Sequence, residues 1–248
     1  MITLLMMFYP NVNKDMRYWS VICSTNPSVT GINNADAQVE TLNKKKEYSF
    51  VDKNEEKYFV EFCRDVWRKT KEIYIDDFNA IDDSKISLIK YFPTKKRVKE
   101  IDVLRHSTQS SFNIFDFLIS DKVLKIFLEF NLPEFNIIPA KVTGFTIQYY
   151  LIGFSIIPYS KIDFEKSIFR NDISGSIITF HNYDEYKNHN TICVSAKKII
   201  LIKRYNYDVL RTPVGLFFSE SLITKMKENN VVGFEIENVF LDNCYDSD

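Results

Sequence analysis

Two segments of the chain distribute apolar and polar residues in the same way. "FLISDKVLKIFLEFNLPEFNI" (117–137) and "LFFSESLITKMKENNVVGFEI" (216–236) align without a gap. Each places a serine, Ser120 or Ser219, between an extended apolar triplet and a run of helix formers. Because a serine oxygen in that position can accept an N–H from the first helical turn, both serines are expected to cap helices. Each copy predicts a strand, a short helix, a turn and a second strand.

Apolar residues recur behind each serine at helical spacing, which gives each short helix one apolar face. Asn131 and Asn230 are expected at the helix ends, where asparagine tolerates a left-handed conformation. Phe135 and Phe234 fall in the strands that follow, and Phe127 and Met226 are predicted core residues at matching positions. The apolar stripes are Val123, Leu124, Phe127 and Leu128 in the first copy and Leu222, Ile223 and Met226 in the second.

The match extends upstream, where Asp-Val-Leu-Arg occurs at both 102–105 and 208–211. The arginine lies fifteen residues before Ser120 but only eight before Ser219, so the first copy carries a seven-residue insertion near His106. Since one such unit cannot bury its own apolar face, the copies are expected to pack on a shared sheet. Further strands are predicted within residues 145–151, 176–180 and 198–205.

The first hundred residues show weaker patterns. Residues 1–10 and 17–24 predict strands, and the polar stretch 25–47 predicts a loop. Phe59, Phe62, Cys63, Val66 and Trp67 have helical spacing, which predicts a helix between Glu55 and Glu72. Strand-like segments follow around two Asp-Asp pairs. We expect a single globular unit over 1–248, in which 1–98 is an N-terminal part without a recognised family and 99–248 is the duplicated part.

Composition supports the β-rich part of this picture. Aromatic residues make up 15% of the chain and include 21 phenylalanines, which favours pleated, half-buried surfaces over a helical bundle. The predicted class is α+β, with a mixed or antiparallel sheet, short packed helices and an internally duplicated strand-helix-strand unit.

Charge and cysteine content restrict the classes of partner and the cellular compartment that are expected. The chain has 32 basic and 33 acidic residues, so no excess charge indicates nucleic acid or an anionic membrane as a partner. The basic runs 95–99 and 197–204 are therefore expected to be solvated surfaces. No apolar run approaches the ~20 residues that span a bilayer, and no export signal is convincing. Four widely spaced cysteines fit a reducing compartment, so a cytoplasmic location is expected.

Catalytic motifs are not evident. The chain has three histidines and contains no GxSxG, Walker, GxGxxG or HExxH pattern. "HNYDEYKNHN" holds His181, Asp184, Glu185 and His189, but this spacing does not match a metal site. We expect no metal, no cofactor and no enzymatic activity. The alternative is a small hydrolase or nuclease whose site assembles from scattered residues.

Three ordered segments resemble a known group of proteins. They are "FLISDKVLKIFLEFNLPEFNIIPAKV", "YYLIGFSIIPYSKIDFEKSIF" and "LRTPVGLFFSESLITKMKENNVVGFEI". Together they resemble the immunity proteins of bacterial polymorphic toxin systems, particularly the families numbered eleven and forty-three, over about 102–240. The resemblance implies a cytosolic antidote that binds and silences a cognate toxin and has no catalytic residues. Asp163 and Ser167 match the pattern, but a turn or helix cap is the favoured interpretation for them, and Arg105 and Arg211 are also interpreted as structural.

One acidic stretch is the candidate contact with such a toxin. "IDDFNAIDD" (75–83) places four carboxylates around one aromatic residue. An aromatic anchor among carboxylates could oppose a basic cleft and steer association. The competing interpretation is an ordinary solvated turn between two strands. The candidate contact residues are Asp76, Asp77, Phe78, Asp82 and Asp83.

Overall fold

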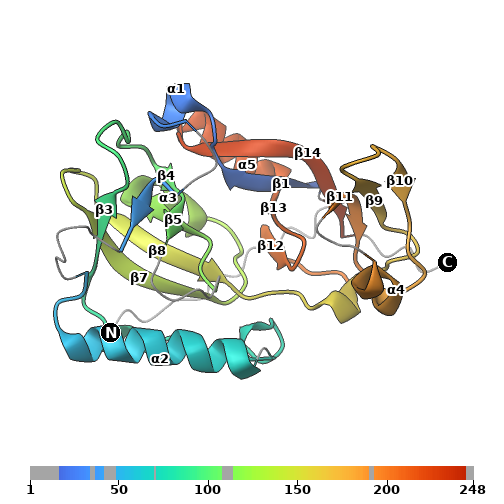
Figure 1. Cartoon of the computed structure of the whole chain (residues 1–248), viewed down its shortest axis with the longest axis horizontal. Coiled ribbons are helices and arrows are strands. Elements are labelled where there is room, and N and C mark those ends of the chain that lie inside the picture. Colours follow the sequence, from blue (N-terminus) through green and yellow to red (C-terminus); the bar gives the residue numbers. More distant parts are fainter. Residues whose placement is uncertain are drawn as a thin grey trace.

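The structure, a computed structural model, describes residues 17–33, 37–41, 49–69, 71–107, 114–189 and 193–243. Within them the chain forms two mixed β-sheets accompanied by helices that are mostly short (Figure 1). The predicted α+β class is therefore confirmed. The strand expected within residues 1–10 lies outside the described residues.

The first sheet is formed by residues from the N-terminal and middle parts of the chain. Its neighbours pair antiparallel except β7 with β3 and β2 with β5. In spatial order its strands are β4 (Val103–Leu104), β6 (Phe117–Ser120), β8 (Tyr149–Phe154), β7 (Phe135–Val142), β3 (Ile89–Pro93), β2 (Val39–Glu40) and β5 (His106–Ser107).

The second sheet combines the C-terminal part of the chain with one strand from near its beginning. Among its neighbouring pairs, β11 and β14 run parallel and the others are antiparallel. In spatial order its strands are β12 (Val209–Thr212), β13 (Gly215–Ser219), β1 (Arg17–Cys23), β14 (Phe234–Asp242), β11 (Val194–Ile200), β9 (Ile168–Asn171) and β10 (Ile177–Ile178).

The helices include the one that apolar spacing predicted between Glu55 and Glu72. It spans Lys53–Lys69 as α2 and buries Phe59, Cys63 and Val66. The other helices are α1 (Pro27–Thr30), α3 (Asp121–Phe127), α4 (Tyr183–Asn188) and α5 (Glu220–Glu228), with 3-10 turns η1 (Lys71–Ile73), η2 (Asp83–Lys85) and η3 (Tyr159–Lys161).

Both predicted serine caps are present. Ser120 Oγ accepts the backbone N–H of Val123 at 3.3 Å, and Ser219 Oγ accepts that of Leu222 at 3.2 Å. Helices α3 and α5 follow directly, and the next strands, β7 and β14, begin at the expected phenylalanines. Phe127 and Met226 are each 1% exposed. The internal duplication inferred from the sequence is confirmed. The expectation that the copies pack on one shared sheet is wrong, because β6 and β7 lie in the first sheet and β13 and β14 in the second.

Strand register shows that the duplication is larger than the sequence match. In the first sheet Val103 pairs with Ile119, and in the second Val209 pairs with the corresponding Phe218. The next neighbour extends this equivalence to a strand that the sequence comparison missed. Ser120 pairs with Tyr149 of β8, and Ser219 pairs with Tyr18 of β1. Strand β1 therefore occupies in the second sheet the place of β8 in the first.

Side-chain bonds repeat this equivalence. Tyr149 Oη donates to the carbonyl of Ile101 at 2.8 Å, and Tyr18 Oη donates to the carbonyl of Tyr207 at 2.7 Å. Parallel pairing then equates β3 with β11, because β3 lies beside β7 as β11 lies beside β14. We call the first sheet with α2 and α3 the first unit, and the second sheet with α4 and α5 the second unit.

Residue 98 does not separate the two sheets. Strands β2 and β3, which precede it, belong to the first sheet together with β4 to β8, whereas β1 lies within the second sheet. Each unit is thus completed by strands from the N-terminal part of the chain.

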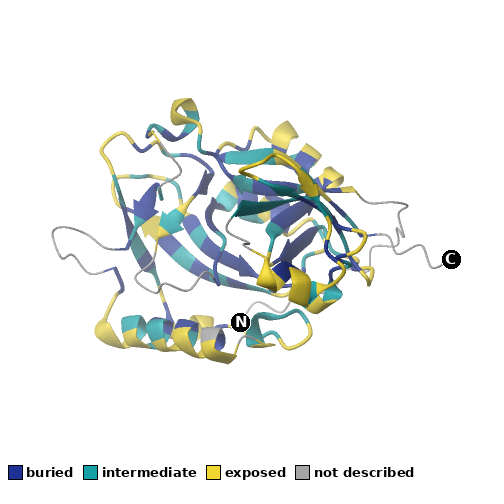
Figure 2. Cartoon of the chain, turned by 45° about the vertical axis from the view of Figure 1, so that its right-hand side comes forward, coloured by how far each residue is buried: buried dark blue, intermediate teal, exposed yellow. Residues whose placement is uncertain are grey.

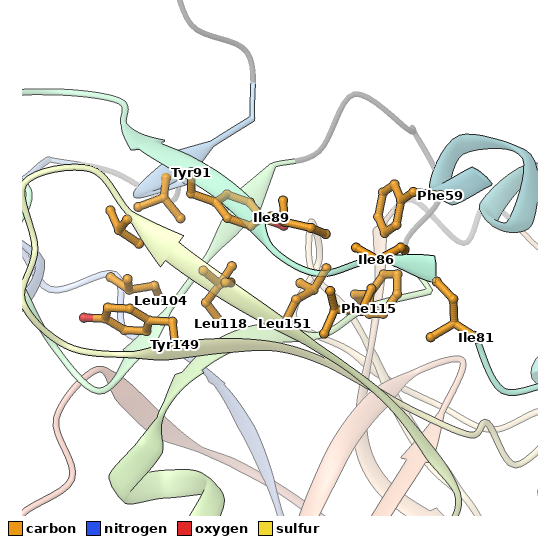
Figure 3. Packing of buried hydrophobic residues seen from close by; sticks show 14 of the residues in the cluster. Phe59, Ile81, Ile86, Ile89, Tyr91, Leu104, Phe115, Leu118, Tyr149 and Leu151 are labelled. Atoms are coloured by element: carbon orange, nitrogen blue, oxygen red, sulfur yellow. The ribbon is translucent and has the colours of Figure 1, made fainter. Parts of the chain in front are cut away.

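Three hydrophobic clusters stabilise the arrangement. The central cluster contains residues of both sheets and of helices α3 and α5, where the ring of Phe127 lies 5.5 Å from that of Phe218. One outer cluster packs α2 on the first sheet (Figure 3), with Phe59 stacked on Phe115 at 5.7 Å. The other lies on the outer face of the second sheet. In Figure 2 the sheet strands are mostly buried, whereas the outer side of α2 is exposed.

Two aspartates connect the units reciprocally. Asp102 Oδ1 accepts the Ser120 hydroxyl of its own unit, and its Oδ2 accepts the N–H of Val232 in the other unit at 2.9 Å. Asp208 Oδ1 accepts the Ser219 hydroxyl, and its Oδ2 accepts the N–H of Asn131 at 3.0 Å. Each helix cap is therefore also a contact between the units.

A buried ion pair makes a further connection. Arg211 Nε of β12 lies 2.9 Å from Asp116 Oδ1, and both side chains are about nine-tenths buried. Asp116 Oδ2 also accepts the N–H of Phe154 at 3.0 Å. Burial raises the pKa of Asp116, while the Arg211 guanidinium opposes that shift. The structural role expected for Arg211 fits these contacts.

Several expected elements differ in extent. The strand predicted at 145–151 begins only at Tyr149, because residues 143–148 turn between β7 and β8. The strand predicted at 198–205 is β11, which ends at Ile200 and has Ile199 as its only fully buried residue. Leu128, expected in the apolar stripe, is 58% exposed because α3 ends at Phe127 and Ile126 faces the core instead.

The helix ends also differ from one another. Asn230 has a positive φ of 51°, as predicted. Asn131 does not, and it uses its backbone N–H to contact Asp208.

Among the described residues, no helix has the length and apolar character needed to cross a bilayer.

Candidate functional site

The predicted contact stretch, residues 75–83, lies in the loop 74–86, which connects α2 and η1 to β3. In Figure 1 it follows the end of α2 that points toward the second sheet. Its beginning is fixed at the junction of the units: Ile75 N–H donates to the carbonyl of Ile156 at 3.0 Å, and Ile156 N–H donates to that of Ile73 at 2.7 Å. Ile75 also packs on the outer cluster of the second unit. The loop therefore contacts both units.

The far end of the loop is held by buried groups of the first unit. Ile81 is 7% exposed, and its N–H donates to Oδ1 of the buried Asn136 at 2.7 Å. The N–H of Asp82 donates to the Tyr58 hydroxyl of α2 at 3.0 Å, and Lys85 lies over the Tyr58 ring. With both ends hydrogen-bonded, the segment between them is presented on a defined support.

The candidate carboxylates divide into two kinds. Asp76, Asp77 and Asp83 are exposed, and no described residue supplies a hydrogen-bond or ionic partner for their side chains. Asp82 is exposed but accepts the Ser84 hydroxyl at 2.6 Å and caps η2. The Ser84 hydrogen bond lowers the pKa of Asp82. Asp76 and Asp77 are thus available to a partner, whereas Asp82 also has a local structural role.

Phe78 lies between the two acidic pairs and is half-buried. A half-buried ring keeps one side in contact with its own protein while offering the other to a partner. Such rigid aromatic surface is typical of residues that dominate binding energy in interfaces. The structure therefore places the aromatic residue and Asp76 and Asp77 on one supported loop.

The second unit has no equivalent of this loop. There α4 ends at Asn188 and β11 begins at Val194, whereas α2 ends at Lys69 and β3 begins only at Ile89. The longer connection is thus specific to the first unit. The shared fold does not require it.

Other residues that the sequence singled out have structural roles. Asp163 Oδ1 accepts the N–H of Lys166 at 3.1 Å, and Ser167 Oγ accepts the N–H of Ile200 at 3.0 Å. Asp163 therefore stabilises a local turn, as expected, whereas the Ser167 hydroxyl contacts β11 rather than capping a local turn or helix. Arg105 is exposed at the position equivalent to the buried Arg211.

The histidine-rich stretch contains helix α4. Its cap, Asn182, accepts the N–H of Glu185, and the His189 ring lies 5.5 Å from the ring of Phe180. Across the described ranges, no three His, Cys, Asp or Glu side chains are grouped as metal ligands.

The basic runs are partly used within the protein. Lys99 Nζ donates to the carbonyl of Ser28 at 2.7 Å. Lys198 pairs with Asp242 at 3.5 Å and lies over the ring of Phe240. These contacts agree with the expectation of ordinary surface charge.

Sequence reasoning missed the supports of the loop, Tyr58 and Asn136. Asn136, the second residue of β7, is 4% exposed. A buried amide requires a hydrogen-bond partner, so this asparagine was the one available signal that a loop docks there.

Comparisons of the chain with protein-family models, with curated proteins and with solved structures found no match.

Proposed function

We propose that this chain is an immunity protein that binds a cognate bacterial toxin in the cytoplasm and neutralises it by stoichiometric contact. The observation that carries the proposal is the acidic loop 74–86. It is fixed at both ends, specific to one unit, and presents Asp76, Asp77 and Phe78 at the surface. The resemblance of residues 102–240 to immunity proteins supplies the class of partner.

The chemistry of the loop favours a basic partner surface. Exposed carboxylates attract a positively charged cleft over a distance comparable to the Debye length, about 8 Å at physiological salt. Such steering mainly increases the association rate. Phe78 would then supply the short-range contact that slows dissociation, because buried aromatic anchors carry much of the energy of an interface.

The class of the protein is tested first. The tagged chain is used to isolate its partner from the native host, and the recovered toxin domain is expressed with and without the chain. We expect a complex of equal stoichiometry, loss of the toxin's activity on addition of one equivalent, and rescue of growth in cells. A purified toxin domain that stays fully active beside excess chain would overturn the proposal.

The loop is then tested with matched variants. Phe78→Ala is expected to weaken toxin binding about tenfold or more, mainly through faster dissociation, with an unchanged unfolding temperature. Asp76→Asn combined with Asp77→Asn should slow association severalfold and reduce its dependence on salt.

Glu165→Gln, which removes an exposed charge from another part of the surface, is the control and should leave both rates unchanged. If all three loop substitutions leave the rates at the native values, the toxin binds elsewhere. The two rates are measured at two ionic strengths so that steering and contact are separated.

A further inference from the structure

The two units cover the outer faces of their sheets differently. In the first unit α2 extends over seventeen residues and places Phe59, Cys63 and Val66 against the sheet. In the second unit the corresponding helix, α4, has six residues and buries Tyr186. Figure 1 shows α2 running along the first sheet, whereas α4 lies at one end of the second.

The sheet residues that α2 covers in the first unit have equivalents of a different kind in the second unit. Leu151 of β8 is fully buried in the outer cluster of the first unit and pairs with Leu118. Its equivalent on β1 is Ser20, which pairs with Phe217, the residue that corresponds to Leu118. Phe115, which stacks on Phe59 of α2, lies two residues before β6 begins, and Val214 is its equivalent before Leu216. Smaller and more polar residues thus replace those that α2 covers.

A groove occupies this part of the second sheet. Its volume is about 680 Å³, and its walls come from β1, β9, β11, β14, α4 and the turn before β13. A two-residue register shift in β14 opposite Ser20 brings Glu237 and Val239 into the wall. The groove therefore lies where the first unit holds its long helix.

The lining combines apolar surface with polar groups that are already satisfied. Val194, Ala196, Val214 and Val239 are partly buried and pack on the outer cluster of the second unit. Ser20 Oγ donates to Glu237 at 2.7 Å, and Asp172 accepts from Arg170 at 2.8 Å and from Ser195 at 2.8 Å. These side chains therefore have hydrogen-bond partners within the protein.

We propose that this groove is a docking site for an amphipathic α-helix of a partner protein, seated as α2 is seated on the first unit. The apolar side of the helix packs on Val214, Val239 and Ala196. A basic residue of the helix faces the exposed carboxylate of Glu237. Because the lining residues are small, they favour reversible docking of the partner helix over its permanent burial in the groove.

The test uses the chain's own helix as a defined probe and requires no toxin, so its outcome is independent of the proposed function. The probe is a fluorescent peptide of residues 53–69 with Cys63→Ser. Lys57 and Glu61, which are four residues apart and 3.9 Å from one another, are joined by a lactam to hold the helix. Its binding to the full chain is followed by fluorescence anisotropy.

We expect saturable binding that Ala196→Trp, which fills the groove, weakens at least tenfold. Val214→Glu should weaken it similarly without requiring space in the core, which keeps the test valid if the tryptophan variant misfolds. Leu128→Trp, on the exposed end of α3, is the matched control and should bind as the native chain does. A scrambled peptide with the same composition should not saturate.

Either of two results overturns the proposal. The first is no saturable binding of the lactam-bridged peptide at millimolar concentrations. The second is equal affinity for the native chain and for the folded groove variants, which would place the peptide elsewhere on the surface.

Discussion

The first and second units share five equivalent strands, whose pairing matches as far as the register shift in β14 opposite Ser20. The units differ in the helices and loops that are attached to these strands. The first unit has a long covering helix and an acidic loop, whereas the second has a short helix and an open groove. Their caps, the tyrosine hydroxyl bonds and the aspartate contacts are the same in both. The repeated residues thus maintain the fold, and the two candidate sites lie where the units differ.

The largest expected effect concerns the buried ion pair between Arg211 and Asp116, which connects the two units. Arg211→Met should lower the free energy of unfolding by about 3–5 kcal/mol, because it leaves the buried Asp116 carboxylate without its cation. Arg105→Met changes the equivalent but exposed residue and should stay within about 0.5 kcal/mol. Urea denaturation of both variants measures the difference. Equal losses would show that the two arginines are not distinguished by burial.

The next pair tests the equivalence of the two helices. Phe127→Ala should lower the free energy of unfolding by about 3–5 kcal/mol and Met226→Ala by about 2–5 kcal/mol, since both residues are buried in the central cluster and truncation leaves a cavity. Leu128→Ala, one position beyond Phe127 and exposed, is the control. An alanine variant that keeps its unfolding temperature while losing toxin binding would mean that the apolar stripe faces a partner rather than the core.

The smallest expected effect is a pH dependence of stability caused by His106, whose equivalent in the second unit is Thr212. Burial lowers the pKa of His106 to about 4. As the pH falls, His106 therefore binds a proton in the unfolded chain before it does so in the folded chain. The free energy of unfolding should fall by at most about 3 kcal/mol between pH 6.5 and pH 4.

His106→Thr should flatten this part of the pH profile of urea unfolding. A profile for His106→Thr that still falls as steeply as that of the native chain would remove His106 as the cause.

The sequence predicted the duplicated helices because Ser120 and Ser219 are caps with a local physical cause. It did not reveal that β1 matches β8, since "RYWSVIC" and "YYLIGF" share little beyond a tyrosine and an extended pattern. Strand pairing between distant segments depends on packing that no local pattern encodes.

The candidate sites show the same limit. The acidic composition of the loop was visible, but its supports, Tyr58 and Asn136, come from a helix and a strand elsewhere in the chain. The groove could not be predicted at all, because its walls come from several strands that are distant in the sequence. It is recognised only when the second unit is compared with the first, where α2 covers the corresponding face.

The position of β1 has a consequence for synthesis in the cell. This strand lies between β13 and β14, yet it leaves the ribosome before the whole first unit and far ahead of both neighbours. At about 5–20 residues per second, translation separates β1 from β13 by roughly 10–40 seconds. During that time the apolar side chains Val21 and Cys23 have no native partner in their own sheet, so nascent chains should depend on chaperones until the C-terminal strands emerge.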